Sequence, residues 1–127
     1  MKAPTKQKLA GNSLRFSARL LFQFRFVAED APKRRICEER IITFKAAHAR
    51  AALSEAKRRG RAARLTYKST RGDRIVFELV GVMELLCLDP VCDPDEVWFR
   101  IVERVTPMER RKALIPPEHQ LNAVRFA

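Results

Sequence analysis

The chain has 127 residues and a formal net charge of +11, from 26 basic and 15 acidic residues, and 46% of its residues are hydrophobic. This length suits a single domain, and this share of hydrophobic residues excludes a chain that is disordered throughout. The excess of positive charge favours an anionic partner such as nucleic acid, an anionic membrane surface or an acidic protein, although a basic surface without such a partner is about as common.

The cysteines and the N-terminus favour a cytoplasmic protein. Cys37, Cys87 and Cys92 are odd in number and form no CxxC motif, so we expect no secreted disulfide framework. We expect Cys37 and Cys87, within strand-like stretches, to be buried as small hydrophobic residues. Residues 1–12 are polar and basic without the apolar stretch of a signal peptide. No uncharged apolar run approaches the roughly 20 residues of a membrane helix, so we expect no membrane association.

The first elements in chain order are a flexible basic arm, over residues 1–13, and a long strand. From Leu14 to Phe26 every even-numbered residue is apolar, and most odd-numbered residues are polar or basic. This alternation predicts a strand with one buried face and one basic face. A charged turn leads to a second strand over residues 35–45, which ends in β-branched and apolar residues. The short connection favours an antiparallel hairpin.

A helix is predicted over residues 46–63. Its apolar stripe is narrow and consists of small residues spaced at helical intervals, among them Ala49, Ala52 and Ala56. Small side chains suit close packing of a helix on a sheet. Gly60 is a candidate for the helix end.

Three further strands are predicted, over residues 65–69, 74–88 and 96–105. The second of these is apolar on both faces, and its Gly81 indicates a bulge or a close backbone approach. Residues 106–127 read as a tail with short helical turns. The sequence therefore predicts an α+β fold for residues 14–105, with an antiparallel sheet of about five strands, in the order β-β-α-β-β-β, and one helix packed on a face. The strand order within the sheet is left open.

Several short stretches, taken in order, resemble a family of short bacterial proteins called domain of unknown function 4288. The resemblance covers about residues 14–105, and its motifs are Phe16–Phe22, Glu38–Ile42, Tyr67–Ser69, Gly72-Asp73, Val80–Val82 and Glu96–Phe99. It implies a compact domain and a bacterial source. It supplies no activity, because none is assigned to the family.

No catalytic or metal site is predicted. Carboxylates and the thiols of Cys87 and Cys92 gather around residues 89–96, where a hard cation could bind, but prolines interrupt the segment and no calcium-loop spacing is present, so we favour a solvated acidic turn. His48 and His119 are far from this segment in sequence, and nothing in their spacing pairs either with a nucleophile. We therefore predict a protein that is not an enzyme and uses no cofactor.

The charge is concentrated in particular segments. Residues 1–35 carry nine basic and two acidic residues, and residues 45–64 carry seven basic and one acidic, whereas residues 65–103 have an acidic excess. Clustered Lys and Arg suffice for salt-sensitive binding to phosphates without sequence readout. The candidate contacts for an anion or nucleic acid are Arg15, Arg19, Arg25, Arg58, Arg59 and Arg61.

Two functions are left open by these patterns. The first is a non-catalytic protein-interaction module, in which exposed strand edges pair with another protein or with a second copy of the chain. The alternative is a sequence-independent nucleic-acid-binding protein that uses the basic surface.

Overall fold

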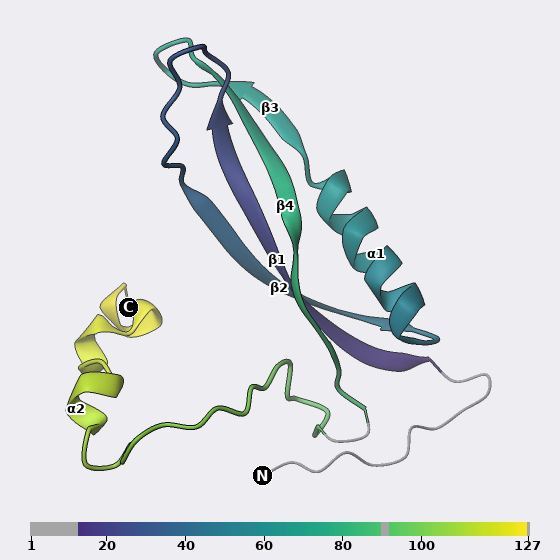
Figure 1. The fold of residues 1–127 in the computed structure, drawn as a ribbon, viewed down its shortest axis with the longest axis vertical. Helices are drawn as coiled ribbons and strands as arrows, with labels where there is room; N and C mark the ends of the chain where they lie inside the picture. The colour runs from purple at the N-terminus through teal and green to yellow at the C-terminus, as the bar shows by residue number, and fades with distance from the viewer. Residues whose placement is uncertain (1–12, 90–91, 127) are drawn as a thin grey trace.

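An antiparallel sheet with one long helix across a face forms the body of the protein (Figure 1). This computed structural model describes residues 13–89 and 92–126. The elements of the body, in chain order, are β1 (Leu14–Phe26), β2 (Cys37–Ala46), α1 (Ala49–Ala62), β3 (Leu65–Lys68) and β4 (Arg74–Cys87). The order of the strands across the sheet is β2-β1-β4-β3. The predicted α+β class, the antiparallel sheet and the single packed helix are confirmed.

The core lies between α1 and the even-numbered face of β1. Phe16 and Phe22, on this face, have at most 1% of their surface exposed, and Ala52 and Ala56 of α1 are fully buried. The helix approaches the sheet closely at Gly60, where a Cβ atom would lie 2.8 Å from Cδ2 of Leu79. The stripe of small helix residues therefore has the role that the sequence predicts for it.

Two bulges in β4 keep its apolar side chains on the helix face. The register passes from Arg19 opposite Glu84 to the next residue opposite Val82, so Met83 is an extra residue in β4, and a second shift makes Val80 extra. Each extra residue moves the following side chains to the other face. The residues of β4 that pair with the buried face of β1 are therefore all apolar: Ile75, Phe77, Leu79, Val82, Leu85 and Cys87. The predicted bulge near Gly81 is confirmed.

The strand predicted over residues 96–105 is wrong, because the described sheet has four strands and this segment pairs with none of them. It leaves the foot of β4 as an extended chain (Figure 1). Three short helical turns follow it: α2 (Arg111–Leu114), η1 (Glu118–Gln120) and α3 (Asn122–Arg125). The basic arm predicted for residues 1–13 lies outside the described residues, apart from Ser13. No helix in the described ranges is long and apolar enough to cross a membrane.

Candidate interaction surfaces

The sheet face opposite α1 is the basic face predicted for β1, and its arginines bond carboxylates of the same chain. Arg19 Nη1 donates to Glu39 Oε1 at 3.0 Å, and Arg25 Nε donates to Glu78 Oε2 at 2.7 Å. The hydrogen bond from Arg25 lowers the pKa of Glu78 and raises the pKa of Arg25. The positive charge of this face is therefore largely balanced within the molecule.

Arg15 ties the segment after β4 to this face. Its backbone N–H and its Nε donate to the two carboxylate oxygens of Asp89, at 2.9 and 3.0 Å. Its Nη atoms donate to the carbonyl oxygens of Asp93, Pro94 and Glu96, at 3.0, 2.9 and 3.3 Å. Burial opposes ionisation of Asp89, but the hydrogen bonds from Arg15 outweigh it and hold the pKa of Asp89 below its ordinary value. One guanidinium thus fastens a whole loop through several carbonyl groups.

The segment continues across the open face as far as Trp98. The guanidinium of Arg19 lies 5.7 Å from the centre of the Trp98 ring, and Ser17 beside it on β1 is fully buried. Three buried polar atoms of the open face and the segment have no hydrogen-bond partner in the described part of the protein: Ser17 Oγ, Arg19 Nε and Trp98 Nε1. Because unsatisfied buried groups are unfavourable, we infer that Arg15 supplies much of the force that holds the segment.

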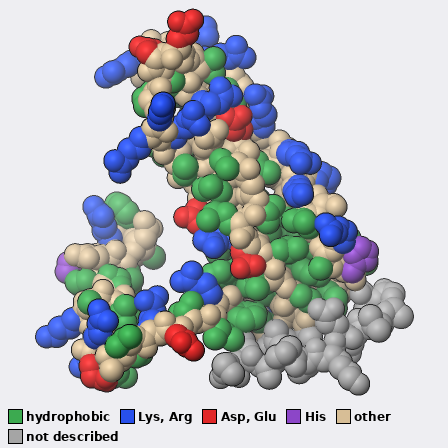
Figure 2. Space-filling model, viewed as in Figure 1, with side chains coloured by type: hydrophobic (Ala, Val, Ile, Leu, Met, Phe, Trp, Pro, Cys, Tyr) green, Lys and Arg blue, Asp and Glu red, His purple; other side chains and the backbone are tan. Residues whose placement is uncertain are grey.

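The outer face of α1 carries a second group of the predicted arginines. Glu55, the one acidic residue of α1, accepts from Arg58 Nε at 2.8 Å and from Arg59 Nε at 2.7 Å. These two bonds lower the pKa of Glu55 from 4.5 to about 2. Arg61 is exposed. With five basic residues and one acidic residue, α1 keeps a net charge of +4, and basic side chains line its outer side in Figure 2.

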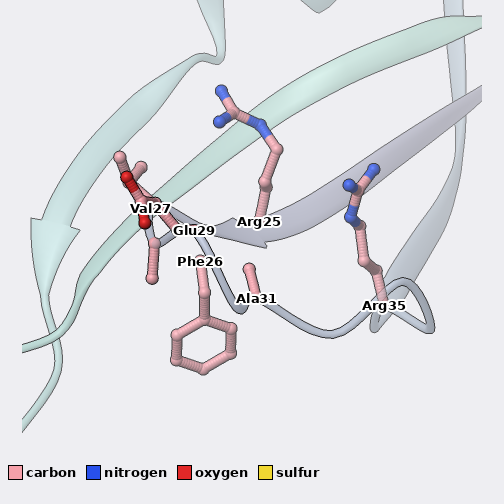
Figure 3. Close-up of a pocket in the computed structure, with 7 residues that line it drawn as sticks. Arg25, Phe26, Val27, Glu29, Ala31 and Arg35 are labelled. Carbon is pink, nitrogen blue, oxygen red and sulfur yellow. The ribbon is translucent and has the colours of Figure 1, made fainter.

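A hollow of about 550 Å³ lies where β1 ends and the chain turns towards β2 (Figure 3). Arg25 and Arg35 project to the same side of the chain there, and Phe26 points the other way. Both guanidiniums already donate to side chains of the sheet, since Arg35 Nη1 donates to Gln23 Oε1 at 3.0 Å. The hollow therefore does not present a pair of uncommitted cations to an anion.

In the described part of the chain, the histidines and cysteines line none of the three cavities of the sheet and its loops. His48 is the N-cap of α1, where its Nδ1 accepts from the backbone N–H of Ala51 at 3.2 Å. Three cavities bounded by described residues, of about 550, 350 and 190 Å³, have no histidine or cysteine in their lining. In the described residues no three His, Cys, Asp or Glu side chains are grouped to hold a metal ion. Burial raises the pKa of the half-buried Cys87. Cys37, predicted to be buried, is exposed because it lies at an edge of the open face.

The most unusual surface is a C-terminal arm formed by residues 100–126, all of which are exposed. Neither α2 nor the two turns that follow it contact a strand or α1 in the described structure. Large apolar side chains nevertheless recur along the arm, and nine of them have 37–73% of their surface in solvent: Ile101, Val102, Val105, Met108, Leu114, Ile115, Leu121, Val124 and Phe126. Figure 2 shows them interspersed with charged side chains. The sequence indicated a tail here, but nothing in it showed that the tail would be unpacked.

The fold and these surfaces define a small α+β domain. Its open sheet face has largely balanced charges, its helix α1 is basic, and its C-terminal arm exposes apolar side chains. The chain belongs to the family described as Domain of unknown function (DUF4288), whose profile matches residues 15–98. This confirms the resemblance that the sequence motifs indicate. No curated protein and no solved structure matches the chain. The C-terminal arm lies beyond the matched residues.

Proposed function

We propose that the protein is a non-catalytic protein-interaction module and that the C-terminal arm is the element that binds. The observation that carries the proposal is the apolar surface of the arm. At roughly 150 Å² for a large apolar residue, its nine side chains expose about 800 Å². A specific interface buries about 800 Å² on each partner, so the arm exposes enough apolar surface to supply one side of such an interface.

The backbone of the arm supports the same proposal. Thr106, where the extended chain turns towards α2, has a φ of 40°, which is unfavourable for a β-branched residue. Strained backbone persists where surrounding contacts impose it. Every residue around Thr106 is exposed, and strained backbone of this kind clusters at binding and switch sites, which supports the proposal.

Site-specific photo-crosslinking in cells tests the proposal. A benzophenone amino acid replaces Val105 in the arm, and a matched variant carries it at Thr70, an exposed residue of the turn before β4. We expect a covalent protein adduct from position 105 and little from position 70. If position 105 gives no more protein adduct than position 70, the arm is not a protein-binding element. The mass of the adduct shows whether the partner is a second copy or another protein.

The net charge of +4 on α1 favours a second candidate, sequence-independent binding of nucleic acid. Arg15, Arg19 and Arg25 contribute less to this candidate, because each has a carboxylate of its own. In α1, by contrast, Arg58 and Arg59 share the single carboxylate of Glu55. Fluorescence anisotropy with a labelled duplex, measured across salt concentrations, tests it. Binding that weakens steeply with salt, and that is reduced when Arg58, Arg59 and Arg61 are replaced by Ala, would support this function. Absence of binding at low ionic strength would rule it out.

A further inference from the structure

The segment over residues 97–105 has the sequence of a strand, but in the described part of the chain it forms none. Six of its residues are β-branched or aromatic, which is the composition that strands favour: Val97, Trp98, Phe99, Ile101, Val102 and Val105. In the described structure the segment belongs to no sheet. An extended chain of this composition can form a ladder of backbone hydrogen bonds by pairing with a sheet edge.

The outer edge of β2 is a sheet edge of matching length. The backbone N–H of Phe24 donates to the carbonyl of Ile36 at 2.9 Å. In an antiparallel ladder every second pair of residues is hydrogen-bonded, so this bond shows which residues of β2 bond to β1. Even-numbered residues of β2 bond to β1, and the N–H and C=O groups of Glu39, Ile41 and Thr43 point away from the sheet. None of the described strands pairs with this side. β2 also contains no proline and no register shift, two features that commonly protect an edge.

We propose that residues 97–105 of one copy pair as an added strand with the outer edge of β2 in a second copy, and that the exchange is reciprocal. This inference rests on the proposed role of the arm and names its partner. Reciprocal exchange of an identical element closes a two-fold dimer. It places the first part of each arm, with Ile101, Val102 and Val105, against the other copy.

A second copy fits this edge better than the chain's own arm. Between β4 and α2 the chain runs away from the sheet instead of turning back along β2 (Figure 1). Charge does not oppose the contact, because β2 carries two acidic and two basic residues and has no net charge. The outer side of α1, with a net charge of +4, would meet a second copy less favourably.

Two threonine-to-proline variants test the edge. Thr43→Pro removes an N–H that points outward from β2 and leaves the ladder with β1 complete. Thr66→Pro is the matched control at the other edge, because the bond from Ser69 N to Asp73 O places the N–H of Thr66 on the outer side of β3. A third variant, with Ile101→Pro and Val102→Pro together, removes an N–H from both sides of the arm segment and disturbs no packed residue.

Size-exclusion chromatography with light scattering measures the mass of each full-length chain, and circular dichroism checks its fold. We expect wild type and Thr66→Pro to have twice the 14.7 kDa mass of one chain. In Thr43→Pro and in the arm variant, the dissociation constant of the dimer should be roughly tenfold or more higher than in wild type. A dimer weakened by Thr43→Pro but not by the arm variant would show direct pairing of β2 with β2 and overturn the proposal.

A wild-type chain that stays monomeric at high concentration would also overturn the exchange. If the residue at position 105 then crosslinks to a different protein in cells, the interaction function stands and only the identity of the partner is wrong. If position 105 crosslinks to nothing, both proposals fail. Should Thr43→Pro unfold, the arm variant decides alone, because its residues are exposed in the single chain.

Discussion

Replacing Arg15 by Ala should release the segment that leads into the C-terminal arm. The substitution removes four hydrogen bonds from the guanidinium to Asp89 and to three carbonyl groups. The side chains of Arg15 and Asp89 are 24% and 33% exposed, so each bond is worth less than a buried charged one. At roughly 0.5–0.75 kcal/mol per bond, the local loss is about 2–3 kcal/mol.

Hydrogen–deuterium exchange of a peptide covering residues 92–98 measures this release. The amides of Cys92 and Glu96 donate to Leu88 and Asp93 in the pinned segment. A loss of about 2–3 kcal/mol should speed their exchange by roughly 30- to 150-fold.

Two variants control for charge and for position on the sheet. Arg15→Lys keeps the charge but not the forked donor, so we expect an intermediate increase in exchange. Arg25→Ala breaks an ion pair elsewhere on the same face and should leave this peptide unchanged. If exchange over residues 92–98 is the same in Arg15→Ala and in wild type, Arg15 does not hold the segment and the reasoning is refuted.

Three other outcomes follow from the packing and the electrostatics. Gly60→Val should lower the free energy of unfolding by about 1–3 kcal/mol in a urea titration, because its Cβ atom would lie within 3 Å of the Leu79 side chain; an unchanged midpoint would show that the contact is loose. Glu55 should titrate near pH 2 by NMR and return towards 4.5 when its two arginine partners become Ala. Since its pKa is lowered on folding, its stabilising effect is complete above about pH 4.5 and is lost as the pH falls through about 2; a midpoint near 4.5 in wild type would mean that the pairs do not persist. Cys37, which is exposed, should react with a thiol reagent well before Cys87, whose pKa is raised by burial; equal rates would contradict the burial described.

The sequence predicts the elements that carry their own periodicity. The alternation from Leu14 to Phe26 and the stripe of small residues in α1 are local signals, and the structure places these elements within a few residues of the predicted bounds. The glycine at position 81 indicated a bulge. The positions of the two register shifts in β4, however, depend on how β4 pairs with β1. No reading of β4 alone shows which of its apolar residues face the helix.

The sequence could not predict the features that depend on a contact between segments far apart in the chain. Residues 96–105 have strand composition, but strand formation needs an available edge, and Arg15 fastens the preceding loop across the open face instead. The pairing of the basic face with carboxylates likewise depends on register, since Glu39 and Glu78 come from different neighbouring strands. The candidate anion contacts therefore stay predictions, and α1 is where the structure leaves them most exposed.

The central claim is that the arm becomes a strand when it meets its partner, and amide exchange over residues 100–105 of the full-length chain tests it most directly. We predict protection of these amides at high protein concentration, loss of protection on dilution, and loss in Thr43→Pro but not in Thr66→Pro. Exchange at the unprotected rate at every concentration would contradict the claim, because no hydrogen-bonded strand would then form from the arm.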